Sequence, residues 1–286
     1  MPRSNNMGRS FEFVLCDQIA RTFPNIKFTE RAFNEQQRDA EHFFSLNHLI
    51  QEEYIKSAEI ICNTWLVDKI NKYDLYSLDR LPDRAGVKGD VTDICIKNYA
   101  EQINISLKHN HDALKHPRIS RVPAWVGIQK DHEYMRIHDQ IWENFFDAAA
   151  QLNPNAVLFK DLINIEKDFV NDNLYFPFCK LISSYLNQFA SEPEAIQQMF
   201  DFLIGNCNFY KIIDRKHFIE IQEFINIPKP THVEISQTSK SYISINFDNG
   251  VSLSLRIHTA EKELTASAKF DVRGRFENLP IIEIQK

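Results

Sequence analysis

Apolar positions follow helical spacing over most of this chain and strict alternation towards its end. They recur every three or four residues at 8–22 and again over the longer segment 34–72, which predicts amphipathic helices. Apolar runs between residues 125 and 204 are also typical of helices. Two short runs dense in Ile, Val and Leu, at 91–97 and 102–109, predict a pair of strands.

Turn residues separate these elements. Residues 77–89 contain Pro82, Gly86 and Gly89 and predict a loop. Alternation at 233–235, 242–247 and 251–257 predicts antiparallel strands, and the Asn249-Gly250 pair between the last two indicates a type I′ hairpin. We therefore expect an α/β or α+β chain in which a small mixed sheet is flanked by helices. Its expected regions are a core at 1–150, a helical region packed on it at 151–208, and an antiparallel β region at 209–286.

Composition is that of a globular protein with an ordinary core. The 286 residues are 43% apolar, and 33 Lys and Arg against 39 Asp and Glu give a net charge of −6. Binding to a polyanion would therefore need positive charge concentrated locally. The five cysteines are widely spaced without a C-x-x-C pair, which predicts reduced core residues. No apolar stretch approaches ~18 residues and the start has no secretory signal, so we expect a cytoplasmic protein.

The densest group of reactive side chains lies on the two predicted strands. Successive side chains of a strand point to opposite faces, so Ser106 and Lys108 share one face. If the strands are neighbours, Asp93 on the first strand reaches the same pocket as Lys108. A carboxylate that holds a divalent cation, with a lysine that orients a water molecule, is the chemistry of metal-assisted phosphodiester cleavage.

This arrangement resembles the PD-(D/E)xK nuclease core, in which an acid on one strand is followed by an acid-x-Lys motif on the next. Here Asp93 is the first acid and Ser106-Leu107-Lys108 is the second element, with Ser106 where the pattern has Asp or Glu. A hydroxyl is a weaker metal ligand than a carboxylate, so a further acid is expected. The resemblance favours Glu12, on the first predicted helix, as this second metal ligand. The alternatives are three other acids: Glu53, Glu59 and Asp90.

A run of basic residues follows the second strand. Between Lys108 and Arg121 there are four Lys or Arg, three His and a single acid, which makes a local positive patch suited to DNA. The candidate DNA contacts in this run are His109, Asn110, His111, Lys115, His116, Arg118 and Arg121. The three histidines lack a fourth ligand at suitable spacing, so no zinc site is predicted.

A longer resemblance supports this interpretation. Residues 108–120 read KHNHDALKHPRIS and are similar to the KHNH-x-A-x-KH-x-R-x-S signature of HaeIII-type restriction endonucleases. Further blocks of that family recur in order across nearly the whole chain: GRSFE at 8–12, GDVTD at 89–93, WVGI at 125–128, FLIG at 202–205, FYK at 209–211, LRIHTA at 255–260 and KFDV at 269–272.

The resemblance implies a restriction-endonuclease-like fold and a type II restriction endonuclease of duplex DNA. It implies Mg²⁺ as the cofactor, a short palindromic site such as GGCC, and a cognate methyltransferase in the same system. It also suggests that Arg256 and His258 lie near DNA. A palindromic site is naturally read by a two-fold homodimer.

Two alternatives remain open from the residues alone. One is a DNA repair or structure-specific nuclease with the same fold, which would not cut plasmid into discrete bands. The other is a non-catalytic DNA-binding protein with a degenerate nuclease core, an interpretation motivated by Ser106 at the acid position.

Overall fold

The computed structural model describes residues 4–81 and 91–286 and divides the chain into two compact units. The first unit comprises the described residues up to Asp112 together with Asn206–Ile227 and Leu279–Lys286. The second unit comprises Ala113–Gly205 and Pro228–Asn278. These units interleave along the chain and do not follow the expected boundaries at 150 and 208. The physical reason is strand pairing, because three strands from the C-terminal third complete the sheet of the first unit.

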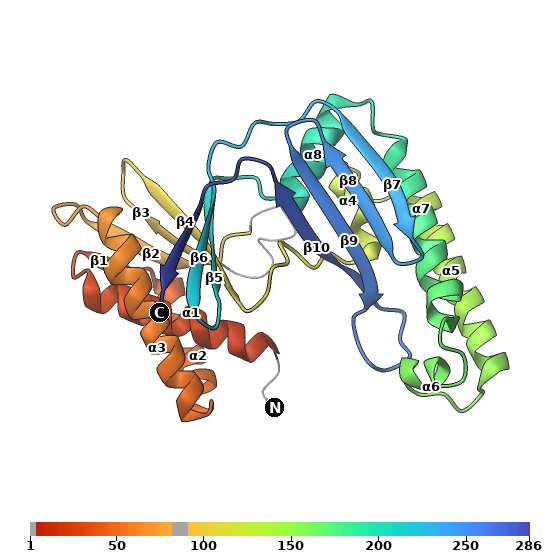
Figure 1. Cartoon of the computed structure of the whole chain (residues 1–286), viewed down its shortest axis with the longest axis horizontal. Helices are drawn as coiled ribbons and strands as arrows, with labels where there is room; N and C mark the ends of the chain where they lie inside the picture. Colours follow the sequence, from red (N-terminus) through yellow and green to blue (C-terminus); the bar gives the residue numbers. More distant parts are fainter. Residues whose placement is uncertain (1–3, 82–90) are drawn as a thin grey trace. The chain divides into compact units, whose positions relative to one another are not determined.

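The first unit contains a mixed sheet of seven strands in the order β1-β2-β3-β4-β5-β6-β11 (Figure 1). Pairing is parallel between β1 and β2 and between β4 and β5, and antiparallel elsewhere. The strands are β1 Ile26–Phe28, β2 Tyr76–Arg80, β3 Ile94–Lys97, β4 Gln102–His109, β5 Phe209–Asp214, β6 Phe218–Phe224 and β11 Ile281–Gln285. The prediction of a mixed sheet flanked by helices is thus confirmed.

Helices of the first unit pack their apolar stripes on this sheet. Helix α1 spans Ser4–Thr22 and buries Phe11, Leu15 and Ile19, as its spacing predicted. The predicted segment 34–72 is helical but divided into α2 Glu30–Phe44 and α3 His48–Ile60, followed by a π turn at Ile61–Trp65 and a 3₁₀ turn at Leu66–Asp68. Side chains of Thr29 and Asn47 accept hydrogen bonds from the first turns of α2 and α3, which fixes where each helix begins.

The prediction of a loop at 77–89 is wrong for residues 77–80, which belong to β2. Tyr76, Leu78 and Arg80 are buried and alternate with more exposed residues, so this segment has the period of a strand. Pro82, Gly86, Gly89 and the candidate acid Asp90 lie outside the described residues. The strand predicted at 91–97 begins only at Ile94, and that predicted at 102–109 is confirmed.

The second unit places helices on one face of an antiparallel sheet with the order β10-β9-β8-β7 (Figure 1). Its helices confirm the predicted helical middle of the chain: α4 Val122–Trp125, α5 His132–Leu152, α6 Phe159–Ile163, α7 Phe176–Asn187 and α8 Pro193–Leu203. Its strands confirm the predicted antiparallel region: β7 Val233–Ser239, β8 Tyr242–Phe247, β9 Val251–Thr259 and β10 Ala268–Phe276.

The hairpin between β8 and β9 is confirmed, but its predicted turn type is wrong. A type I′ turn needs positive φ at both central residues. Within the described chain, Gly250 has a φ of 81° and Asn249 is not among the residues with positive φ. The loop therefore has three residues, with Gly250 alone in the left-handed region where a side chain would be strained.

Four of the five cysteines are buried, as the sequence predicted for core residues, and Cys207 is partly exposed. Among the helices that the structure describes, we find none with the length and apolar character needed to cross a membrane.

Candidate active site

Asp93 lies immediately before β3 and is fixed by its backbone between two neighbouring segments. Its N–H donates to the carbonyl of Ile105 at 2.9 Å, and its own carbonyl accepts from Leu81 at 3.0 Å. The carboxylate accepts a 2.7 Å hydrogen bond from the main-chain N–H of Leu107 and a longer one of 3.4 Å from the Ser106 hydroxyl. These contacts hold Asp93 Oδ2 against β4.

Lys108 reaches the same carboxylate from β4, with 3.5 Å between its Nζ and Asp93 Oδ2. About a quarter of each side chain is exposed, so the pair is open to a ligand. The structure therefore brings together the two residues that the sequence placed on neighbouring strands. An acid and an ammonium group at one partly exposed point can bind a cation and a phosphate next to each other.

Glu12 of α1 joins this group electrostatically. Burial and, after it, the negative charge of Asp93 raise the pKa of Glu12 to about 7 against the opposing charges of Arg80 and Lys108. A buried carboxylate next to a second negative charge makes a site that a divalent cation would stabilise. The oxygen ligands of Glu12 and Asp93 thus fit the hard cation Mg²⁺.

The alternative acids have other surroundings. Glu53 on α3 faces Lys286, with 3.7 Å between Lys286 Nζ and Glu53 Oε1. Glu59 is exposed near the end of α3. Glu12 lies close enough to the candidate site for the negative charge of Asp93 to raise its pKa, and Asp90 lies outside the described residues.

Arg80 binds the Glu12 carboxylate, a role that the sequence analysis did not predict. Its guanidinium is 3% exposed and donates to Glu12 Oε2 at 2.6 Å, and it lies 2.9 Å from the fully buried carboxylate of Asp39. Burial acts to raise the pKa of Asp39, but hydrogen bonds and charges from Arg38 and Arg80 outweigh it and lower that pKa. The alternation of Tyr76, Leu78 and Arg80 was the available signal.

A second lysine, Lys211, lies beside the site, and the sequence pattern predicted no role for it. Lys211 on β5 is 2% exposed and pairs in register with Ser106 on β4. Its ammonium donates a 2.6 Å hydrogen bond to the carbonyl of Asp112. Burial lowers the pKa of Lys211 to about 8, and the neighbouring charge of Lys108 acts in the same direction.

His109, predicted to contact DNA, is held in a pair with a buried acid. Its Nδ1 lies 2.8 Å from Asp214 Oδ2, and Asp214 also accepts from the Ser57 hydroxyl at 2.8 Å. The ring packs edge-on against Tyr54, and 18% of the side chain is exposed. Asn110 follows with a φ of 51° and places its amide nitrogen 3.1 Å from His109 Nε2. This arrangement leaves His109 little surface for DNA.

Part of the predicted basic patch pairs with strand β10 through isolated β-bridges. Lys115 bridges to Val272, and Arg118 bridges to Lys269, in the antiparallel sense. Lys115 Nζ donates to the Phe202 carbonyl at 2.8 Å and lies over the Phe202 ring. The ammonium group of Lys115 therefore already has contacts within the protein.

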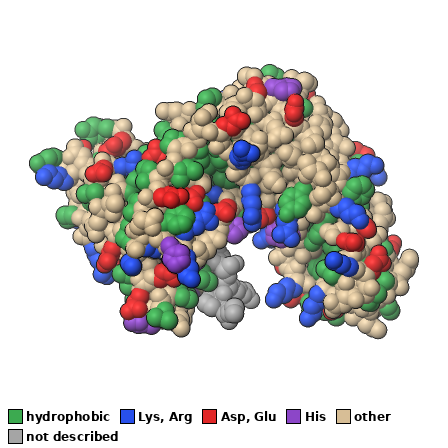
Figure 2. Space-filling view, in the orientation of Figure 1, with side chains coloured by type: hydrophobic (Ala, Val, Ile, Leu, Met, Phe, Trp, Pro, Cys, Tyr) green, Lys and Arg blue, Asp and Glu red, His purple; other side chains and the backbone are tan. Residues whose placement is uncertain are grey.

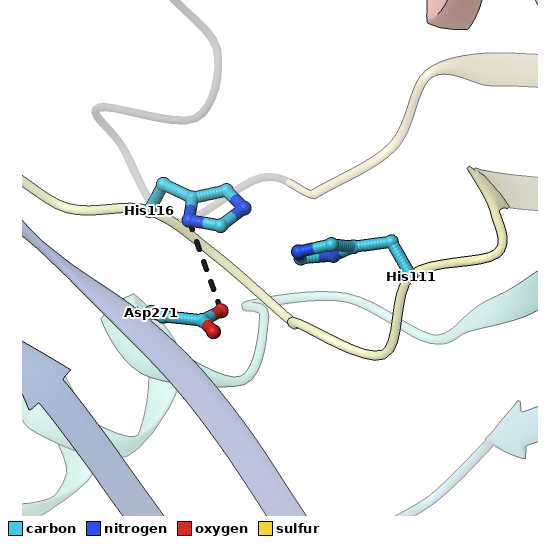
Figure 3. Close-up of side chains that lie close together, drawn as sticks. All are labelled: His111, His116 and Asp271. Atoms are coloured by element: carbon cyan, nitrogen blue, oxygen red, sulfur yellow. Dashed lines mark ion pairs between the residues drawn. The ribbon is translucent and has the colours of Figure 1, made fainter. Parts of the chain in front are cut away.

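Arg118, Arg121 and His116 are exposed at this edge. Arg118 donates to the hydroxyl of Ser267. His116 Nδ1 lies 3.9 Å from Asp271 Oδ1, and Figure 3 shows this pair; His111, labelled in the same figure, belongs to the first unit.

Arg256 and His258 lie on β9, on the sheet face opposite its buried side chains. The buried residues Leu253, Leu255 and Ile257 alternate with them, so the outer face carries only polar groups from this strand. On β10 the register partners of Arg256 and His258 are Asp271 and Lys269. Figure 2 shows a broad tan area on this unit, made of backbone and of side chains that are neither hydrophobic nor charged, with Lys and Arg side chains to one side of it.

Comparisons with known proteins identify the family of the chain. The family model described as HaeIII restriction endonuclease matches residues 8–228. The type II restriction enzyme HaeIII of Haemophilus aegyptius is 27% identical over 312 aligned positions, which cover 95% of this chain and 94% of that protein. No solved structure matches the chain.

Proposed function

The chain belongs to the HaeIII restriction endonuclease family, and on that premise we propose a type II site-specific deoxyribonuclease that requires Mg²⁺. The reaction is hydrolysis of one phosphodiester bond in each strand of duplex DNA. The observation that carries the proposal is the convergence of Lys108 and Asp93, 3.5 Å apart, near Glu12, whose pKa responds to the charges of both.

In this mechanism Asp93 and Glu12 would hold the cation, with the Ser106 hydroxyl as a further oxygen ligand. When bound, the cation supplies positive charge at the scissile phosphate and makes a nearby water more acidic. Lys108 orients the attacking water and stabilises the charge that develops on the phosphate. The Leu107 N–H keeps Asp93 in place, so the acid does not have to reorganise during the reaction.

DNA contacts are proposed on both units. Exposed cations attract the phosphate backbone, while bidentate arginine and asparagine side chains read bases. The proposed contacts are His109, Asn110, His111, Lys115, His116, Arg118, Arg121, Arg256 and His258. Support is strongest for Arg118, Arg121 and Arg256, which are exposed, and weakest for His109 and Lys115, whose polar atoms already have protein partners.

Finer features of the proposal rest on family membership. They are a GGCC recognition sequence, action as a homodimer on a palindrome, a cytoplasmic location, and a cognate DNA methyltransferase that protects the host. A non-catalytic DNA-binding protein is the second candidate, because Ser106 replaces the acid of the general motif.

Digestion of diverse unmethylated plasmids by purified protein, with Mg²⁺ or with a chelator, tests the proposal. Discrete bands that appear only with Mg²⁺ are expected, and sequencing of the fragment ends gives the recognition site. Asp93→Ala should abolish cleavage and retain DNA binding, whereas Glu59→Gln, an exposed carboxylate on α3, should cut like wild type.

DNA that stays intact with wild-type protein and Mg²⁺ would contradict the proposed nuclease activity and favour a non-catalytic DNA-binding protein. Cleavage without discrete bands would favour a repair or structure-specific nuclease.

A further inference from the structure

A buried ammonium group lies beside the position where this chain lacks an acid. In a parallel pair of strands, residues in register point to the same face, so Lys211 shares the face of Ser106 and Lys108. Both Ser106 and Lys211 are 2% exposed. A carboxylate at position 106 would therefore face Lys211 directly.

Lys211 forms no ion pair among the described residues, and the two acids whose charges favour its ammonium form, Asp112 and Glu220, are themselves paired with Arg215. The polar partner of Lys211 among the described residues is the main-chain carbonyl of Asp112. The carboxylate of Asp112 is bound by Arg215, which also pairs with Glu220 at 2.9 Å. An isolated charge is costly to bury, so a lysine kept at such a place indicates an anion that arrives from outside the chain.

Two departures from the general motif therefore occur at one point, a lost carboxylate and a gained ammonium group. A second divalent cation next to Ser106 would lose its ligand and meet the positive charges of Lys211 and Lys108. A scissile phosphate at the same place would meet a favourable charge without any second ion.

We propose that the site binds a single divalent cation, at Asp93 and Glu12, and that the Lys211 ammonium supplies the second positive charge beside Ser106. This inference rests on the proposed function and assigns Lys211 to the scissile phosphate. It makes Lys211 a catalytic residue in addition to Lys108.

The test combines ion stoichiometry with cleavage in four proteins: wild type, Ser106→Asp, Lys211→Met and Ser106→Asp/Lys211→Met. Calorimetric titration with Mn²⁺, on each protein without DNA, counts the ions. We expect one ion for wild type and for each single variant, since in Ser106→Asp the new carboxylate pairs with Lys211. The double variant should bind two. Two ions in wild type or in Ser106→Asp alone would overturn the inference.

Cleavage gives a second readout. Lys211→Met should cut at least a hundredfold more slowly than wild type while still binding one ion, and Lys211→Arg should recover part of the loss. Lys216→Met, an exposed lysine just after β5, is the matched control and should cut normally. Thermal melting of each variant verifies that it is folded.

The two proposals fail in different ways. Wild-type protein that binds no Mn²⁺ and cuts no DNA contradicts the proposed function itself. Wild-type protein that binds one ion and cuts DNA, with a folded Lys211→Met variant of equal rate, contradicts only the role of Lys211.

Discussion

The main-chain N–H of Leu107 donates a 2.7 Å hydrogen bond to Oδ2 of Asp93, so a backbone donor of β4 orients the acid of the candidate site. Any residue except proline at position 107 supplies the same donor. The Ser106 hydroxyl is 3.4 Å from the same oxygen and is the weaker contact. The acid is therefore positioned by the fold of β4 itself.

Ser106→Ala is accordingly expected to reduce the cleavage rate less than Lys108→Met does. We predict about a tenfold loss of cleavage rate for Ser106→Ala, because Asp93 keeps its main-chain hydrogen bond. Lys108→Met should lose on the order of a hundredfold to a thousandfold, since it removes charge that stabilises the transition state. Single-turnover cleavage at saturating Mg²⁺ measures both, and a larger loss for Ser106→Ala than for Lys108→Met would contradict this order.

Arg80→Met should destabilise the protein strongly. It removes a buried partner from Glu12 and from Asp39, whose carboxylate is fully buried. Breaking one side of a buried ion pair costs about 3–5 kcal/mol of unfolding free energy, and Arg38, which remains on Asp39, favours the lower end. Denaturant unfolding measures the change. Arg21→Met, which breaks an exposed pair with Asp17, is the control and should cost less than about 1 kcal/mol.

Affinity for the divalent cation should rise with pH until about pH 7 and then level off. Burial, with the charge of Asp93, raises the pKa of Glu12 from about 4.5 to about 7, so below pH 7 a cation must displace a proton from Glu12. Titration with Ca²⁺ between pH 5.5 and 8 measures this slope. Glu12→Gln should weaken binding and flatten the slope, and an unchanged slope in that variant would exclude Glu12 as the group responsible.

Stability without metal should show the opposite pH dependence. The folded protein holds the Glu12 proton more tightly than the unfolded chain does, because the pKa is higher in the folded state. The stabilisation from Glu12 is therefore complete below about pH 4.5 and is lost as pH rises through about 7. Comparing the unfolding free energy of wild type and Glu12→Gln across this range isolates the effect, since the variant has no proton to lose.

Arg256→Ala should weaken DNA binding and reduce its dependence on salt. An arginine that neutralises one phosphate contributes about one unit to the slope of log affinity against log salt concentration. Fluorescence anisotropy with an uncleaved duplex in Ca²⁺, at several salt concentrations, gives this slope. Arg136→Ala removes an exposed arginine from α5 that is already paired with Glu133, and it should bind DNA like wild type. Equal slopes for all three proteins would argue against a role for Arg256.

Sequence pattern alone predicted most of the local elements and the proximity of Asp93 and Lys108. Helical spacing predicted the buried face of α1, alternation predicted β4 and the second sheet, and the strand period placed Asp93 and Lys108 within reach of each other. These features depend on residues close in the chain, because periodicity reports which face of an element is buried. The resemblance to the family, rather than periodicity, directed attention to the basic segment and to Glu12.

Only the tertiary structure decided which distant segments became neighbours. The parallel pairing of β4 with β5 brings Lys211 beside Ser106, and β2 brings Arg80 beneath Glu12. Periodicity contains no information about the partner of a strand, since pairing depends on packing between segments far apart in the chain. For the same reason the interleaving of the two units could not be predicted from composition or from the order of elements.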